Sequence, residues 1–333
     1  MASWKRFALW KWFVLVGTSA GVGAAGAVSA RAAGPVPDYR VEIRGFDAGE
    51  SDVRAVLDSA ARELWRFFPD YQIDPIVVTR GHEGPITLFG RNGRGEIVMR
   101  LDTGGLYWCQ YAYQFAHELC HVLCAFGEDQ PGNKWFEETL CETASLFVLR
   151  AMARTWKEES PYPNWRDFRD ALRSYADDVL RSRDRVGEIY ERGLPAFYRT
   201  HEQTLREHPC RRDLNGAMSV VLLHLFEEEP NRWEAIRWLN TGPSPEGEPF
   251  RVYLGRWHRA VPERHKAFVE RIAKLYGVEL PSGDAGDVAG ADAAGADAAG
   301  DRDVADASGG EGAAPDRAAG AAALPGAASG KGP

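Results

Sequence analysis

Residues 117–121 read His-Glu-Leu-Cys-His, a pattern that places two histidines four residues apart. On an α-helix this spacing puts both imidazoles on one face, one turn apart. Both can then bind one metal ion at the roughly 2.0–2.1 Å that zinc–nitrogen bonds require. Glu118 is placed to accept a proton from a metal-bound water, whose pKa zinc lowers to about 7. The pattern therefore indicates a zinc site, with His117 and His121 as ligands and Glu118 as general base.

The third zinc ligand is expected from the segment that follows the motif. A catalytic zinc takes three protein ligands and keeps one position open for water. Residues 134–142 read Lys-Trp-Phe-Glu-Glu-Thr-Leu-Cys-Glu and begin a new helix, which the short connection 127–133 folds back against the first. Glu138 and Glu142 lie one turn apart, so one can bind the metal while the other orients a ligand histidine. Acids in a first helical turn also complement the helix dipole, which accounts for Glu137 but not for Glu142.

These two segments together resemble a known family. His-Glu-x-x-His followed by Trp-Phe-Glu-Glu-x-Leu-x-Glu is similar to the gluzincin metallopeptidases, the thermolysin-like and zinc-aminopeptidase-like group. Their third ligand is a glutamate on the next helix, often in a Trp-Leu-Asn-Glu-Gly setting. Matching Trp135 to that tryptophan implies Glu138 as the ligand, with Glu142 as the acid that steadies a ligand histidine. The resemblance covers residues 117–142 and implies a zinc-dependent peptidase acting on a peptide or protein substrate.

The family resemblance extends more loosely to the fold. Gluzincins have an edge strand just before the motif helix, which here implies that residues 95–101 form an edge able to pair with an extended peptide. Two features depart from the family. The aminopeptidase Gly-x-Met-Glu-Asn strand has no match around residues 98–101, and Thr139 replaces the usual glycine after the ligand glutamate. Zinc hydrolysis is therefore implied without aminopeptidase activity.

The resemblance also implies a donor for the oxyanion that forms when water attacks a carbonyl. In gluzincins this donor is commonly a tyrosine or histidine from the helical half. His208, Tyr198 and Tyr190 are the candidates in this chain, although each residue type also occurs as an ordinary surface or core residue.

The elements around the motif predict an α+β fold. Alternating or β-branched runs predict short strands, and apolar periodicity with Pro and Gly breaks predicts helices. Strands are expected at 39–44, 75–79, 85–89 and 95–101, with a helix from 52 to 68 after the first. Helices are expected at 108–126, 135–156, 164–182, 194–207, 213–228, 231–240 and 262–277. The motif helix thus joins an N-terminal mixed strand/helix subdomain to an all-helical C-terminal one, a zincin-like organisation with its junction near 126–134.

The two ends of the chain are expected to lie outside this domain, which we place at residues 34–280. Residues 1–33 are basic, then apolar, then small, the pattern of a secretory signal peptide. An uncleaved membrane anchor is the alternative, although the stretch is barely long enough to span. Residues 281–333 are Ala, Gly and Asp with almost no large apolar side chain, which predicts disorder. The protein is therefore expected to be secreted or in the periplasm or cell envelope, with a membrane partner only if the leader is retained.

Charge and cysteine content narrow the remaining choices. The net charge of −8 gives no electrostatic footprint for nucleic acid. Five cysteines are too few for a disulfide scaffold, and their odd number leaves at least one unpaired or paired between chains. Cys141 either forms a disulfide with Cys120 or Cys124, or all three are buried small apolar residues. A thiolate in place of Glu138 is a further possibility for the metal.

A non-catalytic protein that keeps a zincin-like shell for zinc or partner binding is the alternative to an enzyme. The intact Glu118 argues against it, because such a protein has no need of the general base. The favoured interpretation is an exported zinc metallopeptidase.

Overall fold

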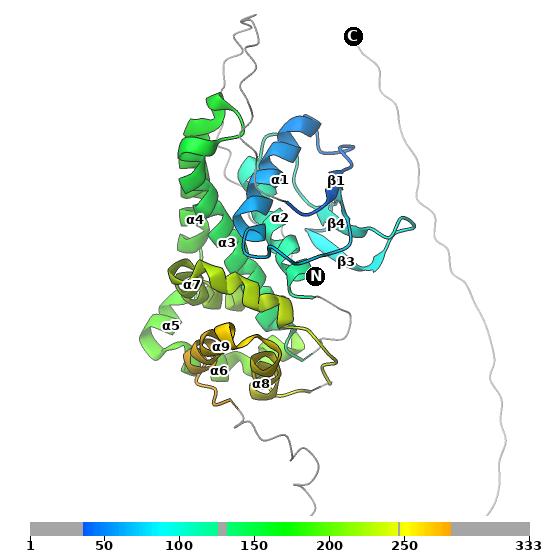
Figure 1. The fold of residues 1–333 in the computed structure, drawn as a ribbon. Coiled ribbons are helices and arrows are strands. Elements are labelled where there is room, and N and C mark those ends of the chain that lie inside the picture. The colour runs from blue at the N-terminus through cyan, green and yellow to red at the C-terminus, as the bar shows by residue number, and fades with distance from the viewer. Residues whose placement is uncertain (1–35, 126–131, 246, 281–333) are drawn as a thin grey trace, which may run out of the picture. The chain divides into compact units, whose positions relative to one another are not determined.

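The computed structural model describes residues 36–125, 132–245 and 247–280 (Figure 1). The expected signal peptide (1–33), the expected tail (281–333) and the centre of the connection after the motif helix (126–131) lie outside these residues. Within the described residues the fold is α+β, as the sequence predicts, with a small mixed sheet followed by helices.

The sheet has four strands in the order β1-β2-β4-β3. Their bounds are Tyr39–Val41 for β1, Ile76–Arg80 for β2, Ile86–Arg91 for β3 and Ile97–Leu101 for β4. Strands β1, β2 and β4 run parallel, whereas β3 runs antiparallel to β4. The helix α1 (Glu50–Trp65) provides the crossover that the parallel pair β1 and β2 requires.

The edge of the sheet beside the motif helix is β3, so the expectation that residues 95–101 form this edge was wrong. β4 pairs with β2 on one side and with β3 on the other. Its apolar residues Ile97, Met99 and Leu101 are fully buried, as suits an interior strand. In β3, by contrast, Ile86 and Phe89 are 48% and 41% exposed. The hairpin turn between the two strands folds β3 to the outside.

The helices other than α1 follow the sheet in the chain. α2 (Trp108–Leu123) and α3 (Lys134–Glu159) lie where the sequence predicts them. The others are the 3₁₀ helix η2 (Pro163–Phe168), α4 (Arg169–Arg181), α5 (Val186–Arg192), α6 (Leu194–Glu207), α7 (Arg212–Glu228), the 3₁₀ helix η3 (Pro230–Trp238), α8 (Phe250–Ala260) and α9 (Glu263–Leu275). Across the described segments we find no helix with both the length and the apolar character needed to cross a membrane.

Two of these helices, α5 and α8, were not expected from the sequence. α5 has only seven residues, and α8 contains Gly255, which lowers helix propensity. Tertiary packing decides in α8, because Phe250, Tyr253 and Trp257 bury one face against the rest of the helical half. A helix was expected at residues 231–240, and residues 230–238 form a 3₁₀ helix there.

Trp135 anchors the first turn of α3 in the helical half. Its fully buried ring lies 5.3 Å from Tyr198 of α6, 4.7 Å from Phe250 of α8 and 5.9 Å from Tyr276 just after α9, centroid to centroid. Aromatic side chains bury more apolar area than other residues, and such pairs add to that gain. The turn that carries Glu138 is therefore held by three separate elements.

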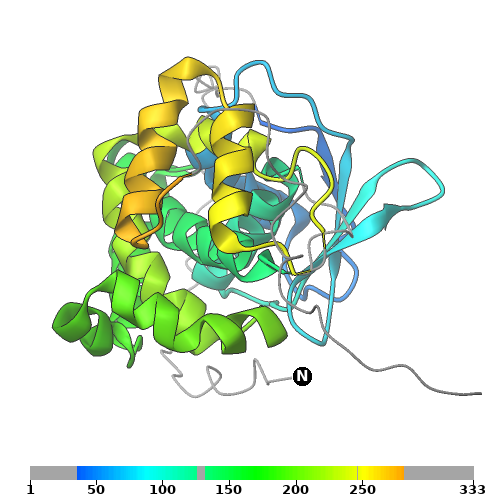
Figure 2. The ribbon, with the colours of Figure 1, turned by 90° about the horizontal axis from the view of Figure 1, so that it is seen from below.

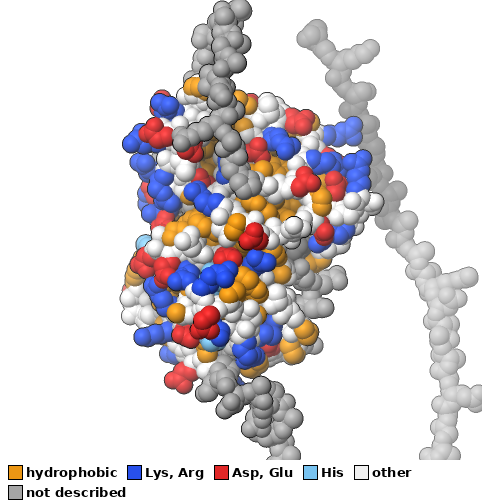
Figure 3. Space-filling view, in the orientation of Figure 1, with side chains coloured by type: hydrophobic (Ala, Val, Ile, Leu, Met, Phe, Trp, Pro, Cys, Tyr) orange, Lys and Arg blue, Asp and Glu red, His pale blue; other side chains and the backbone are white. Residues whose placement is uncertain are grey.

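The helices lie on one side of the sheet, and the β3–β4 hairpin projects on the other side of the view in Figure 2. Lysine and arginine side chains are interspersed with aspartate and glutamate over the face drawn in Figure 3, with hydrophobic side chains between them. This face therefore carries mixed charge and no single-sign field.

Gly104 lies in the segment just before α2, where the backbone passes close to the backbone of Phe46. A substitution of Gly104 tests how much room this contact leaves. A Cβ at Gly104 would lie 2.9 Å from the carbonyl oxygen of Phe46, which also accepts the N–H of Gly105 at 2.6 Å. We expect Gly104→Ala to lower the free energy of unfolding by about 1–3 kcal/mol, because the backbone must shift to relieve the contact. The midpoint of urea denaturation measures the change.

Gly93→Ala is the matched control, since a Cβ there meets nothing within 4 Å. Its free energy of unfolding should stay within about 0.5 kcal/mol of the unsubstituted protein. Equal effects of the two substitutions would contradict a steric role for Gly104.

Candidate metal centre

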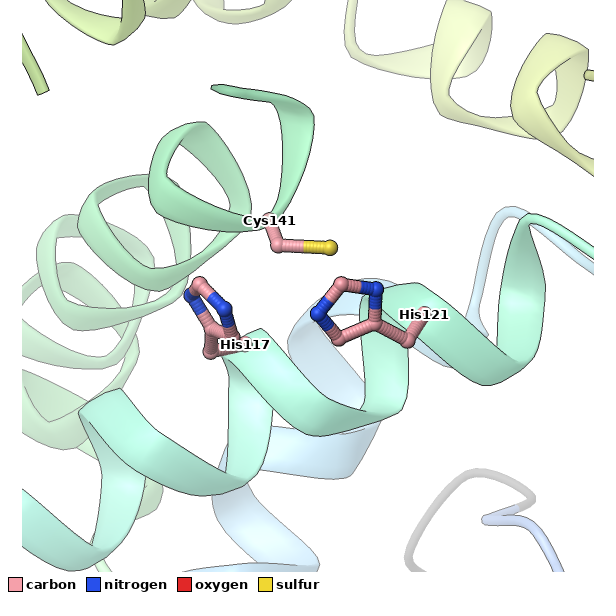
Figure 4. Close-up of side chains that lie close together, drawn as sticks. All are labelled: His117, His121 and Cys141. Carbon is pink, nitrogen blue, oxygen red and sulfur yellow. The ribbon is translucent and has the colours of Figure 1, made fainter. Parts of the chain in front are cut away.

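The two histidines of the motif lie side by side on the buried face of α2. Their ring centroids are 5.1 Å apart, and both side chains are almost fully buried. Figure 4 shows the rings of His117 and His121 rising from α2 toward α3. The helix and the shared face that the spacing predicts are confirmed for this pair.

Glu138 of α3 brings a carboxylate to both rings. Its Oε2 lies 3.4 Å from Nε2 of His117, and its Oε1 lies 3.5 Å from Nε2 of His121. Two atoms bound to one tetrahedral zinc at about 2.0–2.1 Å are themselves about 3.3–3.4 Å apart. The three side chains therefore have the donor types of a zinc site, and each histidine lies near ligand spacing from a different oxygen of Glu138.

Glu137 orients the second histidine. Its Oε1 lies 2.5 Å from Nδ1 of His121, and its Oε2 accepts a hydrogen bond of 2.6 Å from Nδ2 of Asn240. The hydroxyl of Tyr253 donates in turn to Oδ1 of Asn240 at 2.8 Å. A carboxylate at Nδ1 fixes the orientation of the ring and leaves Nε2 facing Glu138.

The hydrogen bond that orients a histidine is made by Glu137 and not by Glu142, for which it was expected. Glu142 was expected to steady a ligand histidine, but its carboxylate accepts hydrogen bonds from the Tyr113 hydroxyl and from Nη2 of Arg183. Among the described residues, Nδ1 of His117 has no hydrogen-bond partner. The histidine-orienting bond is made by Glu137, whose position had suggested only a complement to the helix dipole. No pattern in the sequence predicts the pairing of Glu142 with Arg183, which lies between α4 and α5.

The general base expected from the motif contacts the sheet. The hydroxyl of Thr87 in β3 donates a hydrogen bond of 2.8 Å to Oε2 of Glu118, and both residues are buried. The pairing of β3 with β4 is irregular between Thr87 and Arg91, and such bulges re-aim side chains near functional sites. Thr87 was not foreseen, because the sequence does not show which strand lies beside α2.

The charges around the histidines favour a bound cation. Burial alone would raise the pKa of Glu138, but the charge of His121, the contact with His117 and Lys134 outweigh it and hold the pKa well below its usual value. Burial alone would lower the pKa of His121, whereas Glu138 and Glu137 together raise it to about 9. Glu138 is therefore ionised, and the carboxylates around His121 favour positive charge at this position.

Cys141 also approaches the histidine pair. Its Sγ and one ring nitrogen from each of His117 and His121 all lie within 4.8 Å of one another (Figure 4). The thiols of Cys120, Cys124 and Cys141 are buried and free, and the structure contains no disulfide among these three. Burial holds the pKa of Cys141 well above its usual value. Both Glu138 and Cys141 therefore approach the histidine pair, and Glu138 is the ionised group of the two.

The expected oxyanion donors are placed differently from one another. Tyr198 stacks on Trp135 in the aromatic core of the helical half, and Tyr190 is 75% exposed. His208 is exposed at the end of α6. Two residues further on, partial burial and the nearby charge of Glu138 raise the pKa of the Cys210 thiol to about 11, a proximity that the sequence did not indicate. The segment after α6 therefore borders the site.

Substitutions of Glu138 and Glu137 test whether Glu138 binds zinc directly and Glu137 only orients a ligand. We expect Glu138→Gln to raise the Kd for zinc more than about 100-fold, and Glu137→Gln to raise it about 10–100-fold, the range typical of a partner that only orients a ligand. Competition with a chromophoric chelator measures both. The exposed Glu83→Gln is the control and should leave the Kd unchanged. Unchanged zinc affinity in Glu138→Gln would refute the assignment of the third ligand.

Glu142 is expected to make stability depend on acid pH. Burial would raise its pKa, but Arg183 and Arg212 outweigh burial and lower the pKa from 4.5 to about 2. Because the folded pKa is the lower one, the stabilisation is present above about pH 4.5 and is lost as the pH falls toward 2. Glu142→Gln should cost about 3–5 kcal/mol near neutral pH by leaving Arg183 unpaired, and should flatten the acid limb.

Urea denaturation from pH 7 to pH 2 measures this dependence. Replacing both partners, as Glu142→Gln with Arg183→Met, should recover part of the loss because no buried charge is then left alone. Parallel pH curves for the unsubstituted protein and Glu142→Gln would contradict the coupling.

Comparisons of the chain with models of protein families, with curated proteins and with solved structures find no match. The resemblance over residues 117–142 therefore stays a resemblance. Arguments about function rest on the geometry of His117, His121 and Glu138 and on the chemistry of the side chains around them.

Proposed function

We propose that the protein is a zinc-dependent hydrolase that cleaves peptide bonds. The observation that carries the proposal is that Nε2 of His117 and Nε2 of His121 each lie near ligand spacing from an oxygen of the Glu138 carboxylate. Glu118 follows His117 directly in the chain, so its carboxylate belongs to the same turn of α2. Two neutral donors, one ionised donor and an adjacent base make up the set of groups that metal-assisted hydrolysis requires.

Zinc bound to the three ligands would polarise the scissile carbonyl and make its water acidic near neutral pH. Glu118 would accept the proton of that water and pass it to the departing amine. Thr87 would hold the Glu118 carboxylate through Oε2 and leave Oε1 for the proton transfer. Glu137 would keep His121 in the tautomer that presents Nε2.

The strand β3 is the proposed binding surface for the substrate. It pairs with β4 on one side only, so its other side offers main-chain donors and acceptors to an extended peptide. Thr87 in this strand contacts Glu118, while Ile86 and Phe89 are partly exposed. A peptide added to β3 would therefore pass close to the general base, with apolar side chains of the strand beside it.

Export of the protein is part of the proposal. Its support is the basic, apolar and small-residue pattern of residues 1–33, which lie outside the described residues. Zinc-dependent cleavage of peptides outside the cytoplasm, in the cell envelope or the medium, is the proposed activity.

A non-catalytic zinc-binding protein is the second candidate, and one observation favours it. Of the three expected oxyanion donors, Tyr198 is committed to the aromatic core and Tyr190 points to the surface. His208, close in sequence to Cys210, is the one that remains. A site that binds zinc without a donor for the oxyanion would lose much of the stabilisation of the transition state.

Glu118→Gln tests the enzyme against the binding protein. We expect this variant to keep the zinc affinity of the unsubstituted protein and to lose about 10²–10⁴-fold in the rate of peptide cleavage, because only the proton transfer is removed. The assay is cleavage of a broad peptide library, read by mass spectrometry, with zinc-loaded protein and with protein treated with a chelator. Thr87→Val should give a smaller loss, since it keeps the carboxylate and removes only its hydrogen bond.

Two results would decide against hydrolysis. If zinc-loaded protein cuts no peptide of the library, the binding protein is the better interpretation. If cleavage persists at the same rate after the metal is removed, zinc has no part in it.

A further inference from the structure

The helix α3 offers the histidine pair two different ligands. Glu138 and Cys141 are three residues apart, so they lie on one face of the helix. The carboxylate oxygens lie 3.4 Å and 3.5 Å from the two Nε2 atoms, and Sγ of Cys141 lies within 4.8 Å of a nitrogen of each ring. Figure 4 shows the sulfur of Cys141 directed into the space between the two rings. One pair of imidazoles thus faces an oxygen ligand and a sulfur ligand.

The sulfur belongs to a buried group that we call the thiol cluster, formed by Cys120, Cys124 and Cys141. All three are fully buried and free. Cys120 interacts with both Cys124 and Cys141, so the sulfur that faces the histidines has a second thiol beside it. A hydrogen bond to a sulfur stabilises the thiolate that forms when a metal binds, as the partners of ligand atoms generally do.

The bond lengths and softness of an ion decide which of the two ligands suits it. A zinc ion with bonds of about 2.3 Å to sulfur and 2.0–2.1 Å to nitrogen holds these atoms about 3.5–3.6 Å apart. Each imidazole lies near ligand spacing from one carboxylate oxygen, and the sulfur lies within 4.8 Å of a nitrogen of each ring. An ion with longer bonds than zinc tolerates wider separations of its ligands, and soft ions prefer thiolate over carboxylate.

We propose that the histidine pair has a second mode of metal binding, in which a thiophilic ion is held by His117, His121 and Cys141 in place of zinc on Glu138. Binding transfers the thiol proton of Cys141 to solvent and forms a metal–sulfur bond, with no change in oxidation state. The ion then lies toward the thiol cluster, which moves it away from Glu138. This mode competes with zinc for the same imidazoles, and it does not depend on peptide cleavage.

Titration with Cd²⁺ tests the second mode. The whole protein is reduced, freed of metal and kept without oxygen, and carries Cys210→Ser because that thiol lies near Glu138. The readout is the ultraviolet charge-transfer absorption that a thiolate–cadmium bond produces. We expect saturation at one equivalent in this parent protein, and displacement of bound zinc as the band appears.

Matched variants assign the band to one sulfur. Cys141→Ser should abolish it and weaken Cd²⁺ binding at least about tenfold, and His121→Gln should also abolish it. Glu138→Gln should keep the band while losing zinc affinity. Cys124→Ser, in the same cluster but linked only through Cys120, should keep the band.

Three results would overturn the proposal. They are a parent protein without the band, a band that survives Cys141→Ser, and a band that is lost equally in Cys124→Ser. If Cys141→Ser does not fold, as shown by its circular dichroism, cadmium NMR of the parent replaces it. One sulfur and two nitrogens around the ion support the proposal, and two or three sulfurs refute it. No step uses a peptide substrate, so failure here is distinct from failure of the proposed hydrolysis.

Discussion

The packing of α2 against α3 is the constraint on which the centre depends. His117 and His121 have a common face because of the helix that carries them, but the face has a ligand only because α3 lies against it. Side chains of both helices fasten the pair. The hydroxyl of Ser145 donates to the carbonyl oxygen of Tyr113 at 2.9 Å, and the hydroxyl of Tyr113 donates to Glu142. Trp135 then ties the start of α3 to the helical half.

Two buried carboxylates and a partly buried one near the start of α3 show what this packing has to accommodate. Transfer of a charge into a protein interior is costly unless the charge is paired and hydrogen-bonded. Glu137 pairs with His121 and Lys134, Glu138 lies between the two histidines, and Glu142 pairs with Arg183. Polar groups concentrated in the middle of a core contribute less to stability than apolar ones would, and proteins keep such arrangements chiefly at functional sites.

The same region also combines two kinds of ligand chemistry. Ionised oxygens lie on the side of Glu138, where Cys210 and the segment after α6 border the site. Fully buried sulfurs lie on the side of Cys141, deeper between the helices. In the proposed second mode the imidazoles are shared, so the identity of the ion would follow from its size and softness as well as from affinity. Thr87 of the edge strand β3 donates a hydrogen bond to Glu118 and so connects the strand to the helix that carries the two histidines.

The sequence by itself determined the features that depend on local periodicity. The helical spacing of the histidines, the following helix with Glu138 toward them, and the α+β order of elements are all readable from residues close together in the chain. Strand and helix bounds agree with the structure to within a few residues at β2, α2, α6 and α7.

Tertiary structure alone decided which strand is the edge and which glutamate orients a histidine. The order of the strands depends on the side of β4 on which the hairpin places β3, and the local sequence does not specify that side. Glu142 is captured by Arg183, 41 positions away, and Glu137 by Asn240, 103 positions away. Cys210 reaches Glu138 from beyond α6 in the same way. Contacts between such distant residues arise from packing of the whole core, so no local pattern of spacing or polarity records them.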